Sequence, residues 1–199
     1  IDCGMFQGSK TERELNYRTF PFSPSTLDAV LLTHAHIDHS GLLPKLVKHG
    51  YEGRIHATEA TIDLCSIMLP DSGFIQEMEV RQLNPRRLKR GEAEVEPIYT
   101  LLDAEASLDH FDGHAYKTWF EPIKGVRARF WNAGHLLGSA SIEMEIERPS
   151  SAPLRLLFSG DIGPENKMLQ PDPEAPTNFD HVITESTYGG RRRFERSET

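Results

Sequence analysis

Short apolar runs separated by polar or glycine-containing segments divide the first half of the chain into alternating strands and helices. Residues 28–33 and 54–58 have the apolar pattern of buried strands. Residues 41–49 and 101–111 have helical spacing, and Gly50 is expected to end the first of these helices. A strand, loop, helix and strand in succession predict an α/β layer.

A longer helical pattern lies between these elements. Apolar residues recur at helical spacing over residues 59–83, and Pro70 and Gly73 predict a break within this helix. Residues 84–97 are highly charged and are expected to form a surface connection. Asp103 is a candidate cap for the helix that follows.

The last third of the chain changes from helical to strand patterns. Residues 126–131, 139–146 and 154–158 alternate or are continuously apolar, and 181–184 is a final short strand. Residues 1–4 have the pattern of a strand end that enters a glycine-containing loop. The predicted fold class is therefore α/β, with strands early and late in the chain and helices mainly in its first half.

Composition and charge exclude only a few classes of protein. The chain has 199 residues, enough for one domain or a large piece of one, and its two cysteines are too few for a disulfide scaffold. No apolar run is long enough to span a bilayer, and the first residues lack a signal-peptide pattern, so a cytoplasmic protein is expected. A net charge of −8 argues against a protein that coats nucleic acid. Two basic clusters, at 86–90 and 191–193, are either solvated charge or phosphate contacts.

The densest candidate chemistry is the run from His34 to His39. It places four possible metal ligands in six positions, directly after a predicted strand: His34, His36, Asp38 and His39. Imidazole nitrogen and carboxylate oxygen suit zinc and neighbouring metals. A loop at a strand end can direct the first two side chains to one metal and the last two to another, and Gly41 gives the backbone freedom to turn into the next helix.

Two later segments have the same relation to a strand. His135 follows the strand at 126–131, and Asp161 follows the strand at 154–158. A single loop histidine or aspartate is usually a surface residue or a cap. Together with the first motif, however, both fall at strand ends, the edge where layered α/β folds place their sites. They are therefore candidate ligands.

These motifs resemble those of the metallo-β-lactamase superfamily, through the His-x-His-x-Asp-His run and the later Gly-His and Ser-Gly-Asp contexts. Four further segments resemble its β-CASP branch, which includes RNA-processing exonucleases and endonucleases: residues 2–8, 69–76, 133–140 and 185–189. The resemblance covers essentially the whole chain. The Glu185-Ser-Thr-Tyr segment is the part that favours the nuclease branch.

The resemblance implies a role for each candidate residue. The first of two zinc ions, with manganese as an alternative, would be bound by His34, His36 and His135. Asp38 and His39 would bind the second ion, and Asp161 would bridge the two. Asp2 matches an acid that supports the motif loop, and Glu185 matches an acid that orients a histidine general acid. A turn or cap role for Asp2 and a solvent-facing position for Glu185 stay open.

The family pattern also extends past this chain. The family places a second domain after the Glu185 segment and then returns to supply two more histidines, a general acid and a ligand of the second metal. We therefore expect residues 1–188 to form a partial metallo-β-lactamase αββα sandwich, truncated at both ends. Residues 189–199 would begin the connection to an absent β-CASP domain.

The predicted function is that of a fragment of a two-metal phosphodiesterase. RNA is the expected substrate, cut endonucleolytically or from the 5′ end by a metal-bridging hydroxide, and the isolated fragment is expected to be weakly active or inactive. DNA is the nearest rival substrate, since no contact to a 2′-hydroxyl can be located. A thioester or lactone hydrolase of the same superfamily and a non-catalytic scaffold also stay open, as does the oligomeric state.

Overall fold

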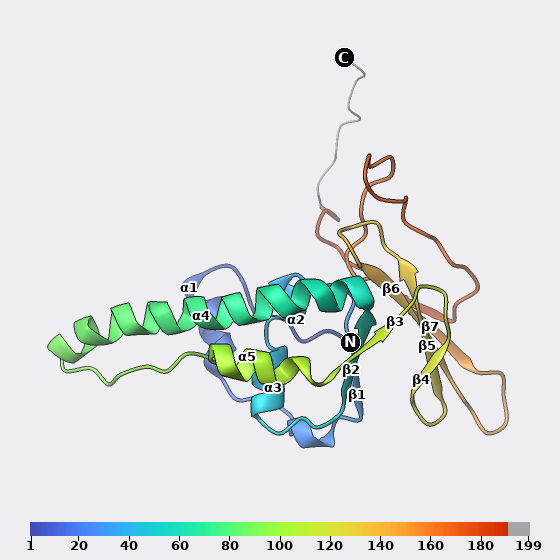
Figure 1. The fold of residues 1–199 in the computed structure, drawn as a ribbon. Coiled ribbons are helices and arrows are strands. Elements are labelled where there is room, and N and C mark those ends of the chain that lie inside the picture. The colour runs from blue at the N-terminus through green and yellow to red at the C-terminus, as the bar shows by residue number, and fades with distance from the viewer. Residues whose placement is uncertain (191–199) are drawn as a thin grey trace, which may run out of the picture.

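A computed structural model describes residues 1–190 as two sheets with helices on one side (Figure 1). The three-stranded sheet is parallel, in the order β1 (Ala29–Leu31), β2 (Arg54–Thr58) and β3 (Phe111–His114). The five-stranded sheet has the order β4-β5-β6-β7-β8, with its first four strands antiparallel and β8 parallel to β7. Its strands are β4 (Phe120–Ile123), β5 (Val126–Asn132), β6 (Ala140–Ile146), β7 (Leu154–Phe158) and β8 (His181–Ile183).

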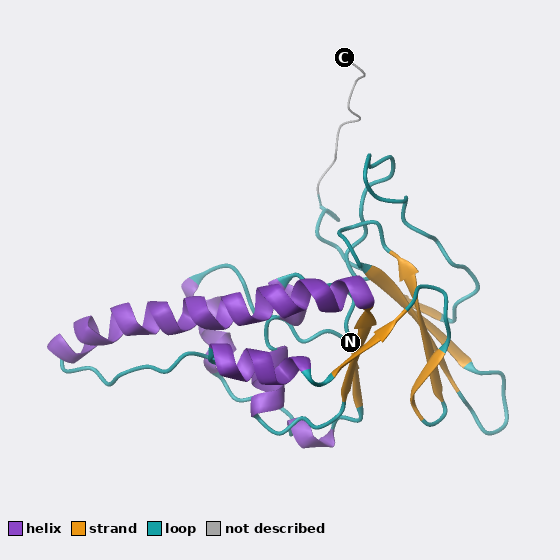
Figure 2. Cartoon of the chain, viewed as in Figure 1, coloured by secondary structure: helices purple, strands orange, loops and turns teal. Residues whose placement is uncertain are grey.

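The helices lie against the three-stranded sheet, away from the five-stranded one (Figure 2). They are α1 (Lys10–Glu14), α2 (Ile37–Ser40), α3 (Leu43–Lys48), α4 (Glu59–Lys89) and α5 (Leu101–Leu108), with two short 3-10 turns, Leu15–Tyr17 and Pro24–Thr26. The described residues thus form one helical layer and two sheets, the αββ part of the expected sandwich. The predicted α/β fold class is confirmed.

Two apolar cores hold these layers together. The larger lies between the helices and the parallel sheet, where Ile55 of β2 and Leu69 of α4 are fully buried. The smaller lies between the sheets, where Leu31 of β1 packs with Phe130 and Ile142 of the second sheet. Since a strand points alternate side chains to opposite faces, β1 contributes Val30 to the larger core and Leu31 to the smaller one.

The first motif is part loop and part helix. His34 and His36 lie in the loop after β1, but Asp38 and His39 lie in the one-turn helix α2, which was expected to be loop. The helix expected at 41–49 is the shorter α3. Residues 1–4, expected as a strand end, form no strand, although the Asp2 N–H donates to the Leu31 carbonyl at 3.0 Å.

Helix α4 runs unbroken through both residues that were expected to interrupt it, and it extends six residues into the expected surface connection. Gly73 lies where α4 meets the start of α5, and a Cβ there would come within 2.7 Å of the Thr100 carbonyl oxygen. The glycine therefore serves close packing between helices. Pro70 lies inside the helix, where it removes one backbone hydrogen bond without ending the helix.

Two further expectations are corrected at α5. Thr100, and not Asp103, is the N-cap: its hydroxyl accepts from the Asp103 N–H, and the Asp103 carboxylate accepts from the Thr100 N–H. Asp103 also pairs with Lys48 of α3 at 2.7 Å. The helix ends at Leu108, three residues early, because Phe111 begins β3, which the sequence pattern did not predict; β4 was missed as well.

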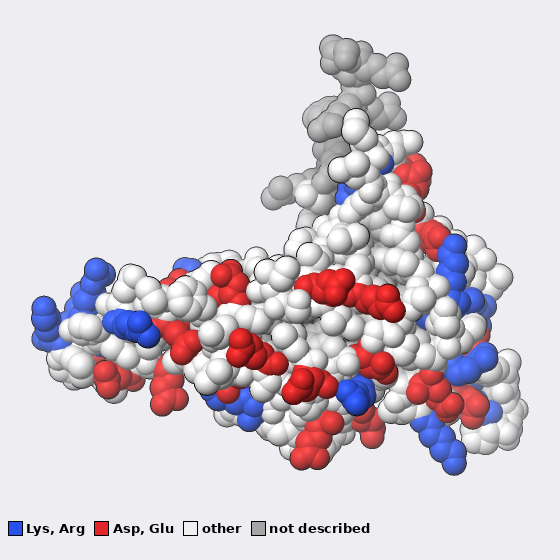
Figure 3. Space-filling model, in the orientation of Figure 1, with Lys and Arg blue, Asp and Glu red and all other residues white. Residues whose placement is uncertain are grey.

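Charge is unevenly spread over the surface. Lys and Arg side chains gather at the C-terminal end of α4, where Arg86, Arg87 and Lys89 lie in its last turn (Figure 3). Arg87 pairs with Glu92 at 3.0 Å, so part of this cluster is neutralised locally. The basic cluster at 191–193 and most of the expected connection at 189–199 lie outside the described residues. Among the helices of residues 1–190, none is long and apolar enough to cross a membrane.

Candidate metal centre

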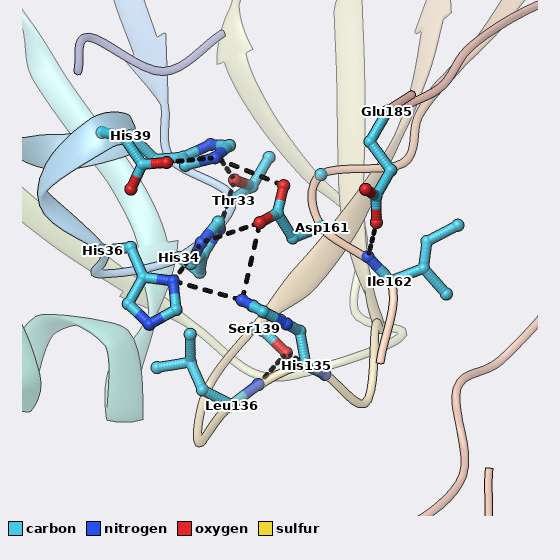
Figure 4. Close-up of polar contacts among 12 residues, drawn as sticks. Thr33, His34, His36, His39, His135, Leu136, Ser139, Asp161, Ile162 and Glu185 are labelled. Atoms are coloured by element: carbon cyan, nitrogen blue, oxygen red, sulfur yellow. Dashed lines mark hydrogen bonds and ion pairs between the residues drawn. The ribbon is translucent and has the colours of Figure 1, made fainter. Parts of the chain in front are cut away.

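The candidate ligands come from the ends of three strands and meet at one place (Figure 4). His34 follows β1, His135 follows β5 and Asp161 follows β7. A hydrogen bond from the Ala140 N–H to the Thr33 carbonyl, 2.8 Å long, joins the two sheets beside them. The strand ends therefore place these side chains together, as the sequence pattern predicted.

Four of the side chains converge on a single point. The Nδ1 atom of His36 lies 3.1 Å from the Nε2 atoms of both His34 and His135. Asp161 Oδ2 lies 3.5 Å from His135 Nε2 and 4.0 Å from His34 Nε2. Ligand atoms around a tetrahedral zinc ion are separated by roughly 3.3–3.4 Å, given zinc–nitrogen distances of about 2.0–2.1 Å. The donor set and its spacing therefore fit one divalent metal ion.

The other carboxylate oxygen of Asp161 faces a second group. Asp161 Oδ1 lies 3.3 Å from His39 Nε2, and the same nitrogen lies 4.0 Å from Asp38 Oδ2. Asp38 is about half exposed, so this group is open to solvent on one side. Asp161 thus directs one oxygen to each group, an arrangement suited to a bridging ligand between two ions.

The Asp2 carboxylate supports the motif through hydrogen bonds. Its carboxylate accepts from the Thr33 N–H at 2.8 Å and the Thr33 hydroxyl at 2.9 Å, and lies 2.7 Å from His39 Nδ1. A proton on Nδ1 leaves the lone pair of His39 Nε2 available on the side that faces Asp161. Asp2 adopts a φ of 55°, a left-handed conformation that costs a non-glycine residue energy and concentrates at functional sites.

The histidines differ in how readily they take a proton. Burial and the neighbouring His39, His36 and His135 lower the pKa of His34 to about 2, so its imidazole is neutral at any ordinary pH. Burial also lowers the pKa of His135. For His39, burial acts in the same direction, but the Asp2 hydrogen bond and the charges of Asp2, Asp161 and Asp38 outweigh it and raise the pKa.

Close backbone packing fixes the two segments that carry the ligands. A Cβ on Gly4 would lie 1.6 Å from the Asp38 carbonyl oxygen, and a Cβ on Gly163 would lie 1.7 Å from that of Gly134. No side chain fits at either position. The segment around Gly4 therefore packs directly against the backbone at Asp38. The segment around Gly163 packs in the same way against the loop that contains His135.

Glu185 lies beside the cluster without joining it. Its Oε1 accepts from the Ile162 N–H at 2.8 Å, next to Asp161 in the chain. Hydrogen bonds from Thr187 and Ile162 lower the pKa of Glu185, so it is a carboxylate at neutral pH. A cavity of about 530 Å³ is lined by both acids and by His135, so Glu185 faces the same space as the ligand cluster.

Three supporting residues were not identified from the sequence. Thr33 connects Asp2 to His34, because its hydroxyl also lies 3.0 Å from His34 Nδ1. The Ser139 hydroxyl accepts from the His135 N–H at 3.0 Å, and Lys167 donates to the His135 carbonyl at 2.6 Å. Thr33 and Ser139 lie within or beside the motifs, which was a usable signal. Nothing near Lys167 in the sequence indicated its contact.

The structure also assembles a group that the sequence did not. His56, Asp112 and His114 meet on one face of the parallel sheet. This group shares no residue with the cluster around His34.

The chain is similar in sequence to a known protein family and to several of its characterised members. A sequence model described as the metallo-beta-lactamase superfamily matches residues 1–196. "Ribonuclease TTHA0252" of Thermus thermophilus is 38% identical over 191 residues, covering 96% of this chain and 38% of the relative. "Transcription termination factor FttA" of Methanocaldococcus jannaschii is 30% identical, covering 95% of this chain and 27% of the relative.

A eukaryotic protein shows the same extent of similarity. "Cleavage and polyadenylation specificity factor 73" of Drosophila melanogaster is 30% identical over 191 residues, covering 95% of this chain and 25% of the relative. The chain therefore spans between a quarter and two fifths of the length of these three relatives. Their printed names describe a ribonuclease, a transcription termination factor and a cleavage and polyadenylation factor.

Proposed function

Because the chain belongs to the metallo-beta-lactamase superfamily, we propose that its ligand cluster binds two zinc ions and serves a hydrolase that cleaves RNA. The division of the Asp161 oxygens between two donor groups carries this proposal. His34, His36 and His135 would hold the first ion, Asp38 and His39 the second, and Asp161 both. Manganese is the alternative metal, since the same donors accept it.

Two ions held by these residues would supply Lewis-acid chemistry, lowering the pKa of a bound water and polarising a phosphoryl oxygen. The residues of the chain supply the positioning. Buried His34 gives the cluster a rigid base, and Asp161 sets the spacing between the two donor groups. Asp2 holds the His39 ring and its tautomer, so that Nε2 faces the site. Glu185 is proposed to orient a histidine that protonates the leaving oxygen.

Similarity to three relatives whose printed names describe a ribonuclease, a transcription termination factor and a cleavage and polyadenylation factor supports RNA as the substrate. DNA stays the alternative. The general acid and one further ligand of the second ion are proposed to come from other parts of a longer protein. Within the described residues, the first ion has four ligand groups and the second has three, so we expect the first to bind more tightly. A cytoplasmic location stays a prediction.

The test compares labelled RNA, DNA of the same sequence and a thioester as substrates. Because the chain spans only part of its relatives, both this chain and the product of the whole gene are assayed, after chelation and then with zinc or manganese restored. RNA cleavage by the whole product is expected, with strong loss in Asp161→Asn and none in His181→Gln, an exposed histidine on β8. Cleavage that survives Asp161→Asn, or hydrolysis of the thioester alone, would overturn the proposal.

A further inference from the structure

A second group of metal-ligand side chains lies on the three-stranded sheet. His56 is on β2, and Asp112 and His114 are on β3. In the parallel register His56 is opposite Asp112, and His114 is two residues further along the same strand. Side chains at these positions point to one face of the sheet. Sheet register, and not sequence proximity, therefore brings the three together.

The ligand atoms are spaced as a single ion requires. His56 Nδ1 lies 2.9 Å from His114 Nε2, and Asp112 Oδ2 lies 3.5 Å from each of these nitrogens. The three separations bracket the roughly 3.3–3.4 Å expected between ligands of a tetrahedral zinc ion. An ion at their centre would replace the hydrogen bond between the two imidazoles by two metal–nitrogen bonds.

The surroundings keep these ligands in place and available. The His114 ring stacks on Phe120 of β4 at 3.7 Å, and His56 lies 5.2 Å from the same ring, so packing fixes both imidazoles. Burial, and for His56 the neighbouring His114, lowers the pKa of both histidines, which leaves them neutral at pH 7. Asp112 is about half exposed and leaves one side open for a water ligand.

We propose that His56, Asp112 and His114 form a second, separate zinc site at the edge of the sandwich. Two histidines and one carboxylate are a common donor set for this ion. β3 is an edge strand of the parallel sheet, and β4 is an edge strand of the other sheet (Figure 1). Zinc bound there joins β2 to β3 and fixes the His114 ring against β4, so it strengthens the contact between the sheets. The proposal does not depend on the substrate or on the activity of the His34 cluster.

Zinc titration by calorimetry tests this in a background in which the first cluster keeps only His34 and Asp38. In the combination of His36→Ala, His39→Ala, His135→Ala and Asp161→Ala, one equivalent of zinc is expected to bind. Asp112→Asn in that background is expected to weaken binding at least about tenfold, since even outer partners of a ligand are worth 10–100-fold. Asp112 is exposed on β3, so its replacement leaves the packed interior intact. His114→Gln removes a nitrogen ligand and is expected to have a larger effect.

His181→Gln is the matched control, because it removes an exposed histidine from a strand outside the group. Thermal unfolding followed by circular dichroism without zinc checks that each variant is folded. Loss of zinc in Asp112→Asn and His114→Gln, with binding kept in His181→Gln, supports the site. Absence of zinc binding in the background protein, or equal binding before and after Asp112→Asn, would show that the group is only a hydrogen-bonded histidine pair.

Discussion

Replacement of Asp2 by asparagine tests the charge and the hydrogen bonds of this side chain without changing its backbone conformation. Asparagine tolerates the left-handed φ of 55°, and its amide oxygen can still accept from the buried Thr33 N–H. Its NH2 group, however, is a donor where the carboxylate was an acceptor. Turned toward His39 Nδ1, it favours the tautomer with the proton on Nε2, the atom that faces Asp161. The expected result is a poorer second metal site in a folded protein.

The size of the effect follows from the contact that is lost. Partners that orient a ligand histidine are worth about 10–100-fold in metal affinity, or roughly 1.4–2.7 kcal/mol. In a His114→Gln background, which removes the separate site at His56, calorimetric zinc titration should therefore show the weaker binding event of Asp2→Asn shifted by this factor. The tighter event should change less, because Asp2 reaches His34 only through Thr33.

A charge-matched control distinguishes this from a general electrostatic effect. Asp28→Asn removes the same unit of charge from an exposed position just before β1. Equal zinc affinities for Asp2→Asn and Asp28→Asn would refute the orienting role of Asp2. Asp2→Ala should in addition lower the free energy of unfolding by about 1–3 kcal/mol, since the buried Thr33 N–H loses its acceptor.

Acidification should release the two ions in order. Protons compete first for His39, whose pKa is raised, and last for His34, whose pKa is about 2. In a His114→Gln background, which removes the separate site at His56, zinc stoichiometry followed from pH 7 to pH 5 should therefore fall from two to one; loss of both ions in one step would contradict this. Glu143→Gln should lower the free energy of unfolding in urea by about 2–4 kcal/mol, because the buried carboxylate pairs with Arg129 and Arg155, and Arg155 alone keeps a second carboxylate partner, Glu145. An unchanged midpoint would show that water already screens the two arginines. Gly4→Ala should lower both the free energy of unfolding and the zinc affinity, because the new Cβ would overlap the Asp38 carbonyl. An unaltered zinc titration would mean that the segment around Gly4 can move aside without disturbing the motif.

The ligand cluster was predictable from the sequence because it depends on strand ends, which apolar runs reveal. His34, His135 and Asp161 each follow such a run within three residues, and the structure brings them together. Their roles as ligands stay proposals. The helix break expected at Gly73 was wrong. A glycine is needed there because the helix packs against Thr100, the N-cap of α5, and a contact 27 positions away leaves no local pattern in the sequence.

The group around His56 shows a different limit. Its assembly depends on the register between β2 and β3, and β3 contains Asp112 and Gly113, which are poor strand formers. No alternation marked that segment as a strand, so nothing placed His114 beside His56. Residue types alone identify possible donors, whereas backbone pairing decides which donors meet.

The convergence of three distant strand ends also has a consequence for how the protein acquires its metal. His36 and His135, 3.1 Å apart in the folded chain, are separated by 99 positions in sequence. No early, locally folded piece of the chain can hold the full donor set, because the two sheets must already have docked. Binding of the proposed ions is therefore expected late on the folding pathway, because long-range closure of this kind is slow. Zinc capture in a refolding time course would report the docking of the two sheets, and a chelator present throughout would leave that docking less stable than it is in the loaded protein.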